Sequence, residues 1–173
     1  DLIVSRGLGD VYKRQELAGI EACQPGMPWV SMHEAVCVTI AEGLIELGVL
    51  NCTLEDALGR VAGKPGVFEG QIRNFFMHGT GHFLGLDVHD VGGGRQGDPN
   101  SSFLLEPGMV LTIEPGLYFG SWRNDILIPE RYAGIGIRIE DDVLVTEEGP
   151  FVLSSSCPKM LDEIEQILSL IHI

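Results

Sequence analysis

Basic residues are scarce in this chain of 173 residues, which has 11 lysines and arginines against 25 aspartates and glutamates, a formal net charge of −14. Because a protein that binds nucleic-acid phosphates needs a basic surface, we expect no nucleic-acid partner. No apolar run approaches the length that spans a membrane, so no membrane partner is expected either. The four cysteines lack CxxC spacing and the density of a secreted disulfide scaffold, which predicts reduced thiols in an intracellular protein.

The two ends of the chain have the pattern of non-native sequence. Residues 168–173 can be encoded by CTGTCTCTTATACACATC, and the reverse complement of that string encodes residues 10–15. This string resembles the mosaic end of a transposon-based sequencing adaptor. We therefore expect residues 1–15 and 168–173 to be adaptor-like scars outside the fold, and residues 16–167 to be one partial domain.

Helical patterns come first along the chain. Residues 16–24 are expected to be the tail of a helix, broken by the prolines that follow. Ser31 and Glu34 form a capping-box pattern for a second helix, with Gly48 after its end and His33 on its surface. Shorter helices are expected at residues 54–58 and from residue 162 to residue 167.

Extended patterns follow the helical ones. The expected strands are residues 109–113, 136–140, 143–146 and 151–153. In the second of these, the isoleucines are expected to point inward, on the face opposite Arg138 and Glu140. Helices followed by strands joined through short turns predict an α+β domain with an antiparallel sheet.

A glycine-rich stretch, residues 77–94, holds three of the five histidines of the chain. From Phe83 to His89 apolar and polar residues alternate, which predicts a strand with one face on an apolar core. The simpler alternative is a glycine-rich hairpin whose histidines are solvated.

Two carboxylates stand on otherwise apolar strands. Glu114 follows a run of valine, leucine and isoleucine, and Glu140 ends a strand rich in isoleucine. A buried carboxylate is costly unless it is paired or bound to a cation, although each of the two could be an edge-strand surface residue. With His82 they make a set of one histidine and two carboxylates, which suits Mn²⁺, Co²⁺, Zn²⁺ or Fe²⁺.

Four segments carry a resemblance to a known family: MHGTGHFLGLDVHDVG, LEPGMVLTIEPGLYF, ERYAGIGIRIEDDVLVT and LSSSCPKMLDEIEQI. In this order they resemble the C-terminal catalytic domain of the Xaa-Pro aminopeptidases (aminopeptidase P), in the pita-bread family of metallopeptidases. The resemblance implies a truncated pita-bread fold, in which helices flank a curved antiparallel sheet. We expect a cytoplasmic location. The last segment is similar to the branch that includes mitochondrial enzymes, which makes the mitochondrion the alternative.

The resemblance also implies roles for individual residues. His82, Glu114 and Glu140 match metal ligands, Glu114 serving in addition as proton acceptor and Glu140 as the bridge between two ions. Arg138 matches a residue that orients a ligating carboxylate. The ions expected are two divalent cations, Mn²⁺ first, with Co²⁺ or Zn²⁺ as alternatives.

Three more residues match the substrate side of the family's site. His78 and His89 match histidines that contact substrate and shuttle protons, and Tyr118 matches a residue that hydrogen-bonds within the site. His78, His89, Glu114 and Arg138 are thus the expected catalytic residues, and His78, His89 and Tyr118 are expected to bind substrate.

The activity implied is removal of the N-terminal residue from peptides that have proline in second position. The alternatives are an Xaa-Pro dipeptidase (prolidase) and a non-catalytic pita-bread module that binds a partner. The family's site needs two further aspartates from an upstream hairpin that is missing here. We therefore expect this fragment to be inactive alone. Separately, the resemblance implies a homo-oligomer as one of the states open to the full-length protein.

Overall fold

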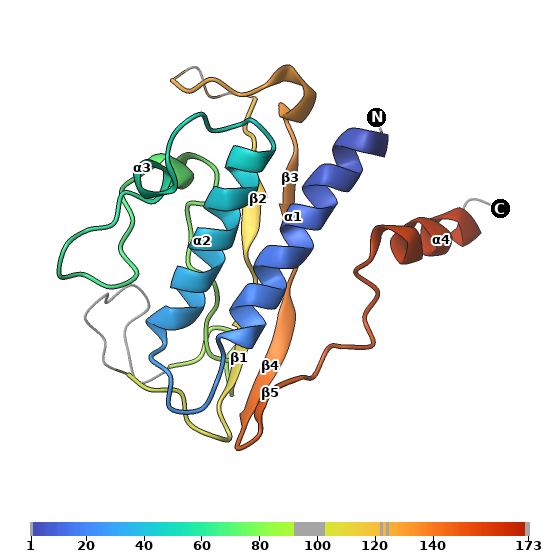
Figure 1. Ribbon diagram of the computed structural model, residues 1–173. Coiled ribbons are helices and arrows are strands. Elements are labelled where there is room, and N and C mark those ends of the chain that lie inside the picture. Colours follow the sequence, from blue (N-terminus) through green and yellow to red (C-terminus); the bar gives the residue numbers. More distant parts are fainter. Residues whose placement is uncertain (1, 92–102, 122, 124, 172–173) are drawn as a thin grey trace.

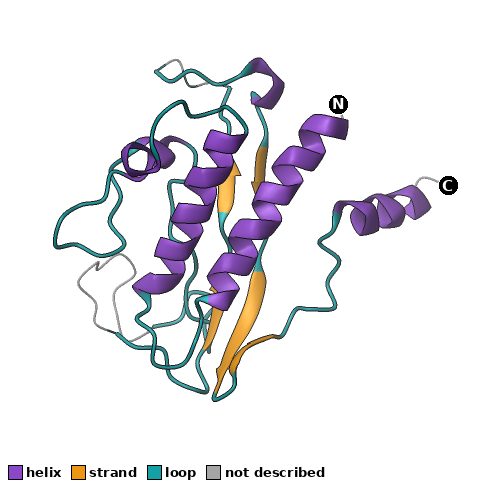
Figure 2. Cartoon of the chain, viewed as in Figure 1, coloured by secondary structure: helices purple, strands orange, loops and turns teal. Residues whose placement is uncertain are grey.

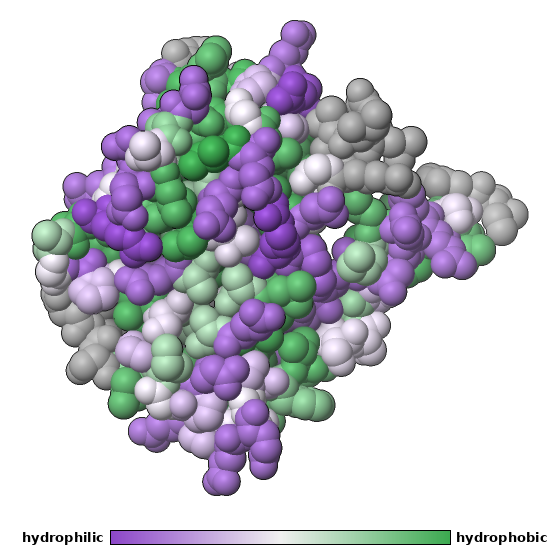
Figure 3. All heavy atoms as spheres, viewed as in Figure 1, coloured by the Kyte–Doolittle hydropathy of each residue, from purple (hydrophilic) through white to green (hydrophobic). Residues whose placement is uncertain are grey.

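Two long helices lie side by side over one face of the strands in the computed structural model (Figure 1). They are α1 (Leu2–Glu21) and α2 (Val30–Glu46). The structure describes residues 2–91, 103–121, 123 and 125–171, without the side chains of residues 2–6 and 171. The face that the two helices present to solvent mixes polar and apolar side chains (Figure 3). The apolar side chains between the two helices and the strands form the core.

The strands form two antiparallel sheets (Figure 2). The first has the order β1-β4-β5 and the second pairs β2 with β3. Their bounds are β1 Val110–Ile113, β2 Gly116–Tyr118, β3 Gly136–Arg138, β4 Asp141–Thr146 and β5 Gly149–Val152. The predicted α+β class with antiparallel strands is thus confirmed.

One register runs through both sheets. In the first sheet Ile113 pairs with Asp141, and in the second Gly116 pairs with Arg138. Continuing either ladder across the break between them places Glu114 opposite Glu140. The two carboxylates therefore lie where the hydrogen-bonded ladder is interrupted.

Shorter elements complete the described chain: α3 (Leu54–Leu58), α4 (Leu161–Ile171) and the 3₁₀ turns η1 (Gln71–Asn74) and η2 (Glu130–Tyr132). Helix α3 has the predicted bounds, with Thr53 accepting a hydrogen bond from the Asp56 amide at its start. Helix α4 stands at the end of an extended segment that leaves β5 (Figure 1). Among the described residues, no helix combines the length and apolarity needed to cross a membrane.

The adaptor-like N-terminal segment belongs to α1. The helical tail expected at residues 16–24 is the end of a helix that begins at Leu2 and stops at Glu21. Leu8, Val11 and Tyr12 are buried against α2 and the strands. The non-native origin of residues 1–15 stays a prediction, but the part of that segment described with side chains packs into the core.

The predicted start of α2 is wrong. The helix begins at Val30, and Ser31 makes no capping hydrogen bond. Glu34 instead accepts a hydrogen bond from the Gly66 amide at 2.9 Å. His33 is partly buried and does not lie on the open surface of the helix, because its ring packs against Phe76 and its Nδ1 lies 2.9 Å from the Thr80 hydroxyl oxygen.

The strand predicted from Phe83 to His89 is also wrong. Phe83 makes only isolated bridges, to Leu111 and Asp90, and the chain then bends. The Asp90 carboxylate accepts a hydrogen bond from the Leu86 amide, which closes a loop and leaves Leu86 exposed. Residues 92–102, with the end of the glycine-rich stretch, lie outside the described residues.

The inward isoleucine face predicted for residues 136–140 is only partly present. Ile139 is partly buried against the core, but Ile137 is exposed. All of β3 is exposed, because the structure describes only one neighbouring strand for it, β2.

Candidate metal centre

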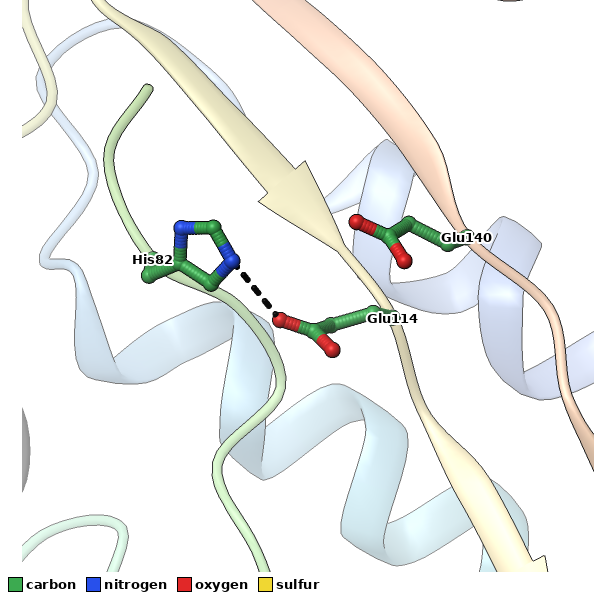
Figure 4. A group of neighbouring side chains, drawn as sticks. All are labelled: His82, Glu114 and Glu140. Carbon is green, nitrogen blue, oxygen red and sulfur yellow. Dashed lines mark ion pairs between the residues drawn. The ribbon is translucent and has the colours of Figure 1, made fainter. Parts of the chain in front are cut away.

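Three side chains from separate segments point toward one another beside the break in the ladder (Figure 4). His82, Glu114 and Glu140 each offer one ligand atom, and these atoms all lie within 4.8 Å of one another. Within the described part of the chain this is the only group of three or more histidine, cysteine or acidic residues so arranged. The structure thus brings together the three residues predicted as metal ligands.

Backbone pairing beside β1 sets the position of His82. The Thr112 amide donates to the His82 carbonyl at 2.8 Å, and the Glu114 amide donates to the Thr80 carbonyl at 2.7 Å. The segment of Thr80 and His82 therefore runs antiparallel beside β1. This pairing places His82 beside the end of β1, next to Glu114, the first residue after the strand.

Thr112 ties the histidine to the carboxylate. Its hydroxyl oxygen accepts a hydrogen bond from the His82 amide at 3.0 Å and donates to Glu114 Oε1 at 3.2 Å. The sequence analysis missed this residue. The available signal was its position two residues before Glu114, on the same face of a strand that is otherwise apolar.

The His82 ring is oriented as a metal-binding imidazole would be. Its Nδ1 lies 3.0 Å from the Phe83 carbonyl, so Nδ1 carries the hydrogen and donates it. The lone pair of Nε2 then faces Glu114 Oε1 at 3.2 Å. Two acceptors at this distance repel each other unless a proton or a cation lies between them. Because His82 is buried, water does not screen this repulsion.

The two carboxylates also favour a cation. Burial raises the pKa of Glu140, and the nearby charges of Glu114 and Asp142 raise it further. Like charges opposite each other on neighbouring strands are destabilising. A divalent ion among these nitrogen and oxygen donors would relieve the repulsion, so the residues present fit such an ion.

A chain of hydrogen bonds leads away from Glu114. Arg138 lies with Nη1 3.4 Å from Glu114 Oε2, and its Nε donates to the Tyr118 hydroxyl at 2.8 Å. Tyr118 in turn lies 2.9 Å from His78 Nε2, and His78 Nδ1 lies 2.7 Å from the Gly79 carbonyl. With Nδ1–H donating to this carbonyl, His78 Nε2 accepts from the tyrosine.

The environment of His78 favours its neutral form. Burial lowers the pKa of the ring, and the Arg138 charge adds to this effect, whereas the Gly79 carbonyl and Glu114 oppose it. A neutral His78 can accept from Tyr118 and pass a proton along the chain. The structure therefore connects three of the residues predicted for the site: His78, Tyr118 and Arg138.

His89 lies on the exposed loop after Phe83, outside this chain of hydrogen bonds. Its ring centroid is 4.3 Å from that of His82, so the two imidazoles are in contact. The predicted substrate histidine is therefore placed beside the group, on its solvent side.

Comparisons with known proteins identify the family of the chain. Residues 8–147 match the model of metallopeptidase family M24. The chain is 44% identical over 156 residues to Xaa-Pro aminopeptidase 1 of Streptomyces coelicolor, covering 90% of this chain and 29% of that protein. It is 39% identical over 163 residues to the Xaa-Pro aminopeptidase of Escherichia coli, covering 94% and 34%. The chain thus spans about a third of the length of these curated relatives.

Solved structures give the same result. The aminopeptidase PepP of Pseudomonas aeruginosa matches with a TM-score of 0.79 and 34% identity, over 96% of this chain and 35% of that one. Zinc-substituted E. coli aminopeptidase P in complex with product matches with a TM-score of 0.80 and 39% identity, over 96% and 34%. These matches confirm the predicted pita-bread fold.

Proposed function

Because the chain belongs to metallopeptidase family M24, we propose that it is part of a metal-dependent aminopeptidase that removes the N-terminal residue from peptides with proline in second position. The observation that carries the proposal is the convergence of His82, Glu114 and Glu140. These residues lie in a chain whose relatives are named Xaa-Pro aminopeptidases.

In this proposal His82, Glu114 and Glu140 would hold two divalent ions, with Glu140 as the ligand shared by both. Mn²⁺ is the ion we expect, with Co²⁺ or Zn²⁺ as alternatives; the zinc-substituted E. coli relative supports an ion of this class. When bound, such ions supply a water of lowered pKa and polarise the scissile carbonyl. Because a two-ion site needs more carboxylates than these, this chain alone should bind metal weakly and be inactive.

The side chains around the group have separate tasks. Glu114 accepts the proton of the attacking water, and the guanidinium of Arg138 holds the Glu114 carboxylate in place. His78 and Tyr118 contact the substrate next to the scissile bond. His89, exposed beside His82, contacts the substrate and passes a proton to the departing proline nitrogen.

The test uses the full-length gene product. Release of the N-terminal residue from an Arg-Pro-Pro peptide is measured with and without added Mn²⁺, beside the His82→Ala and Glu140→Gln variants. Glu106→Gln is the matched control, because Glu106 is an exposed carboxylate in the turn before β1. Both ligand variants should lose metal-dependent release by at least 100-fold, which would correspond to about 2.7 kcal/mol of transition-state stabilisation.

Two other outcomes would contradict the proposal. Cleavage restricted to Xaa-Pro dipeptides would make the protein a prolidase. No release from a folded, metal-loaded chain would make it a binding module.

A further inference from the structure

The carboxylate of Glu140 has no hydrogen bond or ion pair within the described part of the chain. Its partner in the group, Glu114, is held by Arg138 and Thr112. Glu140 is also the most exposed of the three residues that converge. The position of its carboxylate before a metal binds must therefore be set by the backbone on which it stands.

The next residue, Asp141, fixes that backbone. Its side chain is 4% exposed and its Oδ1 lies 2.8 Å from Lys159 Nζ. The Ser154 hydroxyl donates to the same oxygen. A carboxylate this buried is stable only with such partners.

Lys159 also binds the segment that follows β5. Its ammonium also donates to the carbonyls of Ser154 and Cys157, at 3.0 Å each. The Ser154 hydroxyl oxygen accepts from the Asp142 amide at 2.9 Å. The segment after β5 is thus fastened to the first two residues of β4, immediately after Glu140.

Asp141 is also the cross-strand partner of Ile113, the residue before Glu114. A shift of the Asp141 backbone would therefore change the separation of the two facing carboxylates. Lys159 is 12% exposed, and its three oxygen partners use the three hydrogens of its ammonium group. The positive charge of Lys159 is therefore paired within this turn and does not contact His82, Glu114 or Glu140.

We propose that Lys159 is a positioning residue for Glu140: by neutralising Asp141 it holds the start of β4 where Glu140 faces Glu114 and His82. The inference rests on the proposed function, because it treats Glu140 as a metal ligand. Without the ammonium, the buried Asp141 carboxylate turns toward water and moves the peptide unit that it shares with Glu140.

The experiment measures binding of Mn²⁺ alone to the full-length protein by calorimetry, with kcat and KM measured in parallel. Lys159→Met should weaken Mn²⁺ binding by about 10-fold or more, as loss of a residue that supports a ligand commonly does. Lys159→Arg keeps the charge and should restore binding to within about threefold of the parent. Lys64→Met, on an exposed loop, is the matched control and should leave affinity unchanged.

Each variant is checked by circular dichroism and measured well below its melting temperature. If Lys159→Met does not fold, Ser154→Ala serves in its place; it removes one contact to Asp141 and should weaken Mn²⁺ binding by about threefold. Affinity within twofold of the parent in the folded variant used would overturn the positioning role.

Failure of the proposed function has a different signature. In that case the parent would bind no Mn²⁺, or His82→Ala would bind it as tightly as the parent. Either result would also remove Glu140 as a ligand and with it the role of Lys159.

Discussion

His33, a partly buried histidine in the first turn of α2, makes the stability of this fold depend on pH. His33 Nδ1 lies 2.9 Å from the Thr80 hydroxyl oxygen, and its Nε2 lies 3.5 Å from the Cys37 sulfur. The ring also packs against Phe76, with centroids 5.6 Å apart. Burial lowers the pKa of His33 to about 4, and the neighbouring His78 contributes.

The sign and size of the effect follow from this shift. A histidine whose pKa is depressed by folding is stabilised in its neutral form, so its contribution is complete above pH 6.5 and is lost as the pH falls toward 4. Between pH 7.5 and pH 5 the loss is about 2 kcal/mol, and below pH 4 it approaches about 3 kcal/mol. Glu16 acts in the opposite sense, because burial raises its pKa to about 7 and folding then favours its neutral form.

The assay is urea unfolding of the parent and of His33→Gln at pH 7.5 and pH 5. The free energy of unfolding of the parent should fall by about 2 kcal/mol more than that of the variant, and taking this difference cancels the contribution of Glu16. Thr80→Val is the matched control, because it removes the hydroxyl but keeps the titrating ring and so should keep the pH dependence. An equal loss in the parent and in His33→Gln would refute the reasoning.

Two further predictions concern local packing. Gly81→Ala should lower the free energy of unfolding by at least about 2 kcal/mol, because the new methyl group would collide with the Thr112 carbonyl. Gly79→Ala is the control in the same urea assay, because a methyl group there would have no neighbour within 4 Å. Thr53→Ala should cost about 1 kcal/mol, measured as a shift in the urea midpoint, because the Asp56 amide loses its cap; a midpoint equal to that of the parent would contradict the cap.

Much of the candidate site could be predicted from the sequence, because its residue types are unusual in their local setting. Glu114 and Glu140 stand at the ends of apolar strands, and His82 lies in a glycine-rich segment. Those patterns, with the resemblance, predicted the α+β class and the three residues that the structure brings together.

Local patterns failed where a distant contact competes with them. The capping box at Ser31 and Glu34 does not form, because Glu34 binds the Gly66 amide on a loop 32 residues away. The alternation from Phe83 to His89 does not become a strand, because Asp90 bonds back to the Leu86 amide. In both cases a side-chain hydrogen bond offers the backbone an alternative that period and capping rules do not include.

The sequence by itself determined which residues could bind a cation and where most of the strands lie, since both depend on side-chain type and on spacing of a few residues. Only the tertiary structure decided that His33 packs partly buried beside Thr80, that Arg138, Tyr118 and His78 form one hydrogen-bonded chain, and that Lys159 reaches Asp141. These contacts join residues that are distant in sequence. Burial and long-range ion pairs arise when whole elements pack against each other, and no local period records that packing.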